Sequence, residues 1–460
     1  MNPVDPRDAR IAELESLLAA ALEQIRLLSA RVAELERRLG ERGGGDGGPA
    51  GGKPGAAAPR EPSDRKRGGQ PGHKGHRRDL LGPEQVTRTV ECFPEECRKC
   101  GEALPKEPDD SPVLHQVIDL RVIRDVTEYR KHRVTCDCGE TTCGSLPVGA
   151  PAGVLGTRLL ALVALLTAAC HVSRRKVQLL LSDVLNVDIS LGALSESEEV
   201  VSDAVAGPVE DARLHAIAAG VKYADGTTWY RAHIFRSLWT LGTSAVTVFG
   251  IFASGTKDAL KAWMGQTGIL VSDRGSQLVF WAMRRRQICW AHLLRKFAWY
   301  AQQGGEAGQL GATLLVYTRC VLREWRRVRD GCITRGTFAR NTSTQRLLIE
   351  ALLETGTRLK PIAGSCRHIL KHREALWRFA TADGVEPTNN HAEQEIRGFV
   401  LWRKTTLGSQ SERGDRFAAN LKSVIHTCRK QQRHVWNYLV EAIDASLSKR
   451  SPPSLLPDAP

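Results

Sequence analysis

The sequence has no apolar run long enough to cross a membrane, and its N-terminus carries no apolar leader. Its longest apolar run, Leu159 to Leu166, is far shorter than the roughly 20 residues that a membrane helix needs. The N-terminus is charged and heptad-patterned, unlike the short apolar stretch of a signal peptide. We therefore expect a soluble, intracellular protein with no membrane partner.

A disulfide framework is also missing, because twelve cysteines are spread over 460 residues with no secretory signal. Reduced thiols or metal ligands are expected instead.

Acidic residues are too few to balance the basic ones. The chain has 65 Lys and Arg but 51 Asp and Glu, which gives a net charge of +14. This favours a polyanionic partner over a small neutral substrate. The length predicts about two to four domains, and an apolar content of 42% excludes wholesale disorder.

Residues 8–40 carry a heptad repeat that predicts a coiled coil. Apolar residues fill all nine successive a and d positions: Ile11, Leu14, Leu18, Ala21, Ile25, Leu28, Val32, Leu35 and Leu39. This pattern favours a parallel dimer, and the alternative is an amphipathic helix packed on its own domain. A flexible tether and basic arm follow over 41–80, because nine of the sixteen residues from Gly40 to Gly55 are Gly. We therefore expect an oligomerisation arm.

The end of this tether is basic, with seven Lys and Arg against two acidic residues from Arg60 to Arg78. Two explanations are equally good: an arm that orders on DNA phosphates, or a solvated charged linker. The candidate DNA contacts in the arm are Arg65, Lys66, Arg67 and Lys74.

Residues 81–150 contain two cysteine pairs, each followed by Gly, with strand-like segments at Val117–Ile123 and His132–Thr135 between or beside them. Two such knuckles joined by strands predict a zinc-ribbon-like module with structural Zn²⁺. Its four expected ligands are Cys97, Cys100, Cys136 and Cys138. Cys92 and Cys143 are candidate substitutes, because a single residue separates the second pair. Reduced thiols without metal are the alternative.

Residues 151–212 are expected to form a helical DNA-binding region. The run from Leu159 to Leu166 suits a buried helix, and amphipathic segments follow at Ser173–Leu185 and Ser190–Ala204. A short turn between two helices is typical of helix-turn-helix proteins. Ordinary helical packing explains the pattern about as well.

After Gly220 the pattern becomes that of a sheet. Val221–Asp225 is a short strand that ends on an acid, and two β-rich runs follow at Ser237–Gly242 and Ala245–Ala253. A helix at Lys257–Met264 then leads to Gly268–Asp273, a second buried strand that ends on an acid. This order predicts a ribonuclease-H-like sheet, in which the first two metal-binding carboxylates end adjacent central strands.

A third carboxylate is expected on a helix that begins after a Pro-Thr pair. Glu393 and Glu395 are two residues apart and point to different faces, so at most one can join Asp225 and Asp273. Three carboxylates can hold two divalent ions about 4 Å apart for phosphodiester hydrolysis or transesterification. Each acid alone is ordinary at a surface, and Glu393 could pair with Arg397. The order of the set is what indicates a site.

Three motifs resemble the transposases of the bacterial insertion-sequence family sixty-six. They are Gly72-His-Lys-Gly-His76, Cys289-Trp-Ala-His292-Leu-Leu-Arg-Lys-Phe297, and Thr388-Asn-Asn-His-Ala-Glu393 with the later Arg403-Lys404, Gly408-Ser and Gly414. The resemblance covers nearly the whole chain, and the last motif is its most specific part.

The resemblance implies a DDE-type DNA transposase with a ribonuclease-H-like core, which cleaves and joins DNA at the ends of its own mobile element. Its catalytic residues would be Asp225, Asp273 and Glu393, as ligands of Mg²⁺ or Mn²⁺. The partners expected with it are double-stranded DNA (terminal inverted repeats and target), further copies of the chain, and accessory proteins of the same element. The expected location is the bacterial cytoplasm, at the nucleoid. The chain departs from the family pattern at Gly226, where an acid usually stands, and at Thr388, where Asp is usual.

The 119 residues between Asp273 and Glu393 are too many for a simple crossover. Helical patterns at Leu310–Arg327 and Ser343–Glu354 predict an α-helical insertion over 301–385.

Cys289 and His292 either start a helix within this stretch or form half of a zinc site, with Cys366, His368 and His372 as candidate partners. We favour the helix start, and His292 is a candidate neighbour of the carboxylates.

From Arg397 to Arg433 there are nine Lys and Arg against two acids, interleaved with Trp402 and Phe417. A solvated helix face is the default explanation. Beside a phosphodiester site, a track along the DNA backbone is favoured. Its candidate contacts are Arg397, Arg403, Lys404 and Arg413.

The fold class expected is therefore multidomain α+β and α/β. The ribonuclease-H-like core would occupy 213–300 and 386–448, and the tail at 449–460 would be disordered. The function expected is a DNA transposase. A metal-dependent nuclease without strand transfer, or a catalytically decayed DNA-binding derivative, are the alternatives.

Overall fold

The computed structural model describes residues 79–120 and 122–457. The predicted coiled coil at 8–40, the tether and nearly all of the basic arm lie outside these residues. Contacts divide the chain into two units, residues 53–130 and the remainder. Nothing in the described residues is long and apolar enough to make a membrane-crossing helix.

The unit at 53–130 has little regular structure over its described residues. It contains the 3-10 helix η1, Pro83–Gln85, and a turn at Cys97–Cys100 closed by an isolated bridge between Glu96 and Ala103. The strand predicted at Val117–Ile123 is wrong, because its described residues form no strand. Val117 is 80% and Ile123 88% exposed, so no partner strand or core covers the alternating apolar residues.

The second unit begins with a small antiparallel hairpin. Strand β1 (Arg133–Thr135) pairs with β2 (Thr141–Cys143), and the Cys136-Asp-Cys138-Gly turn joins them. The other cysteine pair, Cys97 and Cys100, belongs to the other unit. The four-thiolate zinc site therefore stays a prediction.

Three helices follow, close to where the sequence placed them. They are α2 (Thr157–Ala168), α3 (Arg174–Leu185) and α4 (Leu191–Ala218). The side chains of Ser173 and Ser190 cap α3 and α4, as serine does at many helix starts. Helix α4 continues beyond the predicted end at Ala204, because its buried stripe runs on through Val205, Val209, Ala212 and Ala216.

The main sheet has five strands in the order β5-β4-β3-β6-β7. These are β3 (Val221–Arg231), β4 (Ile234–Gly242), β5 (Thr247–Phe252), β6 (Ile269–Ser272) and β7 (Arg286–Ile288). Strand β4 is antiparallel to β3 and β5, whereas β6 is parallel to β3 and β7. One half of the sheet is therefore a meander and the other half is parallel, with α5 (Lys257–Met264) in the crossover.

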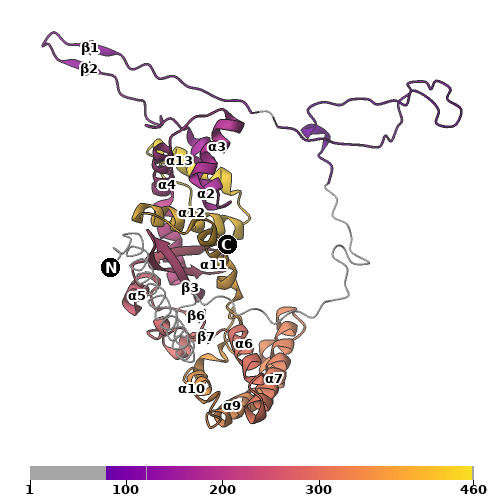
Figure 1. Ribbon diagram of the computed structural model, residues 1–460, viewed down its shortest axis with the longest axis vertical. Helices are drawn as coiled ribbons and strands as arrows, with labels where there is room; N and C mark the ends of the chain where they lie inside the picture. Colours follow the sequence, from indigo (N-terminus) through magenta and orange to yellow (C-terminus); the bar gives the residue numbers. More distant parts are fainter. Residues whose placement is uncertain (1–78, 121, 458–460) are drawn as a thin grey trace, which may run out of the picture. The chain divides into compact units, whose positions relative to one another are not determined.

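Helices cover the sheet from two ends (Figure 1). The helices beside β6 and β7 are α6 (Trp290–Ala301), α7 (Gly305–Arg329), α8 (Arg335–Asn341), α9 (Ser343–Gly356) and α10 (Ala363–Leu370). The C-terminal helices are α11 (Asn390–Thr406), α12 (Glu412–Lys430) and α13 (Val435–Leu447). Helix α11 packs on β3 and β4, α12 on β5 and α4, and α13 on α2.

Short 3-10 helices complete the described chain: η2 (Ser276–Leu278), η3 (Met283–Arg285), η4 (Arg373–Ala375) and η5 (Arg378–Ala380). Within the tail that we expected to be disordered over 449–460, the described residues up to 457 pack on the helices. Leu455 is fully buried, and its carbonyl accepts a hydrogen bond from Gln431. Apolar burial and this bond hold the segment on α12 and α13.

Candidate active site

The parallel half of the sheet places Asp225 and Asp273 at the same edge. The register pairs Tyr223 of β3 with Val271 of β6. Asp225 and Asp273 each stand two residues beyond this pair, so they lie at the same level of the sheet. We expected β3 to end at Asp225, but it continues because β4 pairs with it as far as Arg231. That pairing is a long-range contact that a local pattern does not contain.

Glu393 enters from α11, whose first turn is tied to the sheet. The side-chain amide of Asn389 donates to the carbonyl of Ala224 at 2.9 Å, directly before Asp225. The backbone N–H of Asn389 donates to Sγ of Cys289 at 3.1 Å. These two bonds place the start of α11 between β3 and α6.

The pKa of Asp225 is shifted by its burial and by the other two acids. Burial, the carboxylate of Asp273 and, to a smaller extent, that of Glu393 together raise the pKa of Asp225 to about 7. The N–H of Gly226 and the guanidinium of Arg295 act in the opposite direction. A cluster in which one acid resists ionisation beside two others favours a bound cation. The catalytic role of the three acids remains a proposal.

In metal-free solution, the free energy of unfolding is expected to fall as pH rises from about 4 to about 7. The pKa of Asp225 in the folded chain, about 7, lies above its ordinary value of 3.8, so the unfolded chain releases this proton first. The loss is on the order of 3 kcal/mol. Urea denaturation at pH 5 and pH 8 in EDTA would measure it. Asp225→Asn should flatten the dependence, and an unchanged slope in that variant would contradict the assignment.

A second group of side chains adjoins Glu393. His292 Nδ1 lies 3.3 Å from Glu393 Oε1, and Cys289 Sγ lies 3.7 Å from the same oxygen. Both residues are at the start of α6, as the helix-start interpretation predicted, and His292 does lie beside a carboxylate. The alternative zinc partners Cys366, His368 and His372 are not part of this group.

The sequence contained no signal for Arg286. Its side chain is fully buried and donates to Ser272 Oγ at 3.0 Å and to the carbonyl of Asp273 at 2.8 Å. The N–H of Gly275 donates to Asp273 Oδ1 at 2.9 Å. These contacts hold the loop after β6 and therefore orient Asp273.

Gly226, one of the departures from the family pattern, has a packing reason. A Cβ atom at this position would lie 2.7 Å from the indole ring of Trp239 on β4, closer than two carbon atoms approach. Trp239 is buried and donates to Ser237 Oγ at 2.8 Å. An acid at 226 is therefore incompatible with this indole.

Gly226→Ala is expected to destabilise the fold by about 1–3 kcal/mol, because the methyl group must displace the buried indole of Trp239. Gly207→Ala in α4 is the matched control, since a Cβ there meets no atom within 4 Å. That variant should be neutral, or more stable by up to about 1 kcal/mol. Chemical denaturation of both variants would check this, and equal stability of the two would contradict the steric argument.

The predicted DNA contacts fall into three groups. Arg397 and Lys404 are exposed on α11. Arg403 instead donates to the carbonyl and hydroxyl of Thr228, and Arg413 pairs with Glu199 at 2.8 Å, so both are used within the chain. The remaining four, Arg65, Lys66, Arg67 and Lys74, lie outside the described residues.

The aromatic residues of the predicted DNA track do not face solvent. Trp402 and Phe417 are 5% and 3% exposed, and Trp402 packs edge-on against Trp229. Their spacing reflects the buried faces of α11 and α12, so the expectation that they interleave with the basic residues at a DNA surface is wrong.

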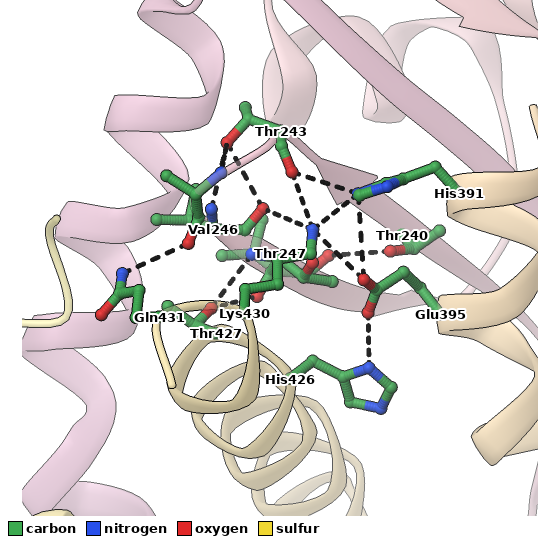
Figure 2. Close-up of polar contacts among 12 residues, drawn as sticks. Thr240, Thr243, Val246, Thr247, His391, Glu395, His426, Thr427, Lys430 and Gln431 are labelled. Carbon is green, nitrogen blue, oxygen red and sulfur yellow. Dashed lines mark hydrogen bonds and ion pairs between the residues drawn. The ribbon is translucent and has the colours of Figure 1, made fainter. Parts of the chain in front are cut away.

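Glu395 belongs to a buried polar network (Figure 2). Its carboxylate accepts from His426 Nδ1 at 2.5 Å and lies 3.2 Å from Lys430 Nζ. Lys430 also donates to the carbonyls of Thr243 and Val246 at 2.8 and 3.2 Å. The hydrogen bond with His426 and the ammonium group of Lys430 lower the pKa of Glu395 to about 2, although burial acts in the opposite direction. The network joins α11, α12 and the β4–β5 turn.

The fold is that of a mixed α+β protein, in which Asp225 and Asp273 lie at one level of neighbouring parallel strands and Glu393 is near enough to raise the pKa of Asp225. A family model described as "Transposase IS66 family" matches residues 152–416, more than half of the chain and all three acids. The chain therefore belongs to the IS66 family of transposases, as the resemblance predicted, and the family indicates a DNA-processing enzyme.

The chain is also similar to an uncharacterized protein, y4qI, of Sinorhizobium fredii (strain NBRC 101917 / NGR234). The two are 28% identical over 148 residues, which cover 31% of this chain and 27% of the relative. The matched segment thus spans about a quarter of the relative's length.

Proposed function

We propose that the chain is a DDE-type DNA transposase that cleaves DNA at the ends of its element and joins them to a target. The observation that carries this proposal is the strand register that puts Asp225 and Asp273 at one level of the sheet, with Glu393 near enough to raise the pKa of Asp225. The three acids come from two parallel strands and a helix that are far apart in the sequence, and the pKa of Asp225 responds to both other acids.

The strand order supports a ribonuclease-H-like core. The antiparallel meander of β3, β4 and β5, with the central strand β3 beside β6, is the arrangement expected from the sequence, and β7 is an additional strand that was not expected. Helices α7 to α10 lie between Asp273 and Glu393 in the chain, which supports an α-helical insertion in this core.

The residues present fit magnesium or manganese, because Asp225, Asp273 and Glu393 offer only oxygen ligands. Bound there, these ions would supply an activated nucleophilic oxygen and stabilise the leaving oxygen. Arg286 and Gly275 orient Asp273, and Asn389 orients the helix of Glu393. Arg295 lies 3.9 Å from Glu393 with 64% of its side chain exposed, so it is placed to contact a DNA phosphate.

The wider assembly is part of the same proposal. The heptads at 8–40 would join copies of the chain, and the basic arm would hold DNA through its phosphates.

The four cysteines Cys97, Cys100, Cys136 and Cys138 would hold structural Zn²⁺. The backbone N–H groups of Cys100 and Lys99 lower the pKa of Cys97, and those around Cys138 do the same for Cys136, which favours thiolates at both turns. Terminal repeats, target DNA and accessory proteins of the element would be the partners, at the nucleoid.

The test is a cleavage and strand-transfer assay in Mg²⁺ or Mn²⁺, on DNA that carries the genomic repeats flanking the gene. We expect joined products from the wild type and none from Asp225→Asn or Glu393→Gln. Cutting without joining would identify a nuclease instead. Tight binding without any chemistry, with accessory proteins supplied, would identify a decayed transposase.

A further inference from the structure

We propose that Cys289, His292 and Glu393 form a site for a thiophilic divalent cation such as Zn²⁺, and that occupation of this site inhibits DNA cleavage by withdrawing Glu393. The inhibitory half rests on the proposed transposase function. The binding half does not, because it depends only on the positions of three side chains.

The distances fit a tetrahedral ion. With Zn–S near 2.3 Å and Zn–N and Zn–O near 2.1 Å, a tetrahedral ion holds S and O about 3.6 Å apart and N and O about 3.4 Å apart. Here Cys289 Sγ and His292 Nδ1 lie 3.7 and 3.3 Å from Glu393 Oε1. All three ligand atoms are within 4.8 Å of one another. A shared ion can therefore reach them without a change of backbone.

The local structure prepares two of these ligands. Cys289 and His292 are three residues apart at the start of α6, so their side chains lie on one face. The N–H of Asn389 already donates to the sulfur at 3.1 Å, a contact that fixes the position of the sulfur. His292 Nδ1 is buried and makes no hydrogen bond within the described residues, although a buried polar atom usually has a partner. A bound ion would satisfy it.

The ligand types separate this site from the carboxylate site. Sulfur and imidazole nitrogen select zinc-like ions, whereas magnesium takes oxygen ligands. Glu393 belongs to both groups of ligands. An ion held by Cys289 and His292 would therefore compete for the carboxylate that Asp225 and Asp273 need as their third partner. Side-chain exposures of 34% for His292 and 28% for Glu393 leave a route for an ion from solvent.

Cobalt(II) substitution tests the binding half on the full-length, reduced chain. A Co²⁺–thiolate site absorbs in the near ultraviolet and shows visible d–d bands, so each variant is titrated and compared with the wild type. The cysteines at 97, 100, 136 and 138 are present in every protein and cancel in the difference. Cys366→Ser is the matched control, because Cys366 is also buried and lies outside the group.

Cys289→Ser is expected to lose the absorption of one thiolate-bound cobalt ion, and Glu393→Gln to weaken its binding at least about tenfold. Cys366→Ser should match the wild type. His292→Gln serves as a second ligand variant if circular dichroism shows that Cys289→Ser is misfolded. The same spectrum and affinity in the ligand variants as in the wild type would overturn the proposal.

Inhibition is measured separately, with zinc titrated into the cleavage assay at fixed Mg²⁺ and each protein normalised to its own zinc-free rate. Half-inhibition of Cys289→Ser should need at least about ten times more zinc than that of the wild type. Equal sensitivity would overturn the inhibitory half. If no protein cleaves DNA at all, the proposed function fails, while the cobalt spectra still decide whether the site exists.

Discussion

Asp273→Asn is expected to lower the rate of DNA cleavage at least about a thousandfold while DNA affinity stays within about twofold. An amide is a far weaker cation ligand than a carboxylate, and several kcal/mol of transition-state stabilisation would be lost with it. Each 1.36 kcal/mol corresponds to about a factor of ten in rate.

The structure explains why this variant should still fold. The N–H of Gly275 donates to Oδ1 of Asp273 at 2.9 Å, and the amide oxygen of asparagine accepts the same bond. Arg286 binds the backbone carbonyl of residue 273 and not its side chain. These two hydrogen bonds therefore do not need the carboxylate charge, although that charge also stabilises the buried guanidinium of Arg286.

Cleavage of an end-labelled element end and a gel-shift titration of the same DNA measure the two quantities on one substrate. Asp258→Asn, an exposed acid in the first turn of α5, is the control and should change neither. If Asp273→Asn lost binding and cleavage together, Asp273 would serve the fold or DNA binding instead of catalysis.

Glu395→Gln is expected to destabilise the protein by about 3–5 kcal/mol, the usual cost of removing one partner of a buried ion pair. Glu395 is 11% exposed and lies 3.2 Å from Lys430 Nζ, whose side chain is 12% exposed. Without the carboxylate, this ammonium group would lie in the interior beside the carbonyls of Thr243 and Val246 and His391 Nε2, with no opposite charge from residue 395 (Figure 2). Urea denaturation at pH 7 measures the change.

The pH dependence of this contribution has a definite sign. The folded-state pKa of Glu395, about 2, lies below the ordinary value of 4.5. Its stabilisation is therefore present above about pH 4.5 and is lost as pH falls through that value toward 2. Glu395→Gln should remove this acid-sensitive part of the stability.

Glu393→Gln is the matched control, two residues away on the same helix. It removes a like charge beside Asp225, so the fold should be unchanged or more stable while cleavage is lost. If Glu393→Gln unfolded the chain and Glu395→Gln left it stable, the assignment would be contradicted. Glu393 would then serve stability, and Glu395 would be the candidate for catalysis.

Local patterns were sufficient for much of this fold. The predicted helix at Lys257–Met264 has the same bounds in the structure, and α3 and α4 begin directly after the serines that the sequence marked as starts. Caps and apolar periodicity act over a few residues, so the chain carries them in full. The same holds for the separation of Glu393 from Glu395, which follows from helical geometry alone.

Long-range contacts decided the rest. Pairing with β4 extends β3 past Asp225. Among the described residues, no partner strand covers Val117 and Ile123. Similar apolar alternation therefore gives a strand in one place and none in the other. Cys289 meets Glu393 across 104 residues of chain, and Arg403 is occupied by Thr228.

The sequence by itself determined which acids could form a site, because each stands at a strand or helix that local periodicity defines. The sequence predicted adjacent strands for Asp225 and Asp273 and a carboxylate beside His292, but only the tertiary structure fixed the register that puts the two acids at one level and the position of the Cys289 thiol beside Glu393. The reason is physical: strand register and side-chain proximity depend on partners distant in the chain, and a local pattern does not specify them.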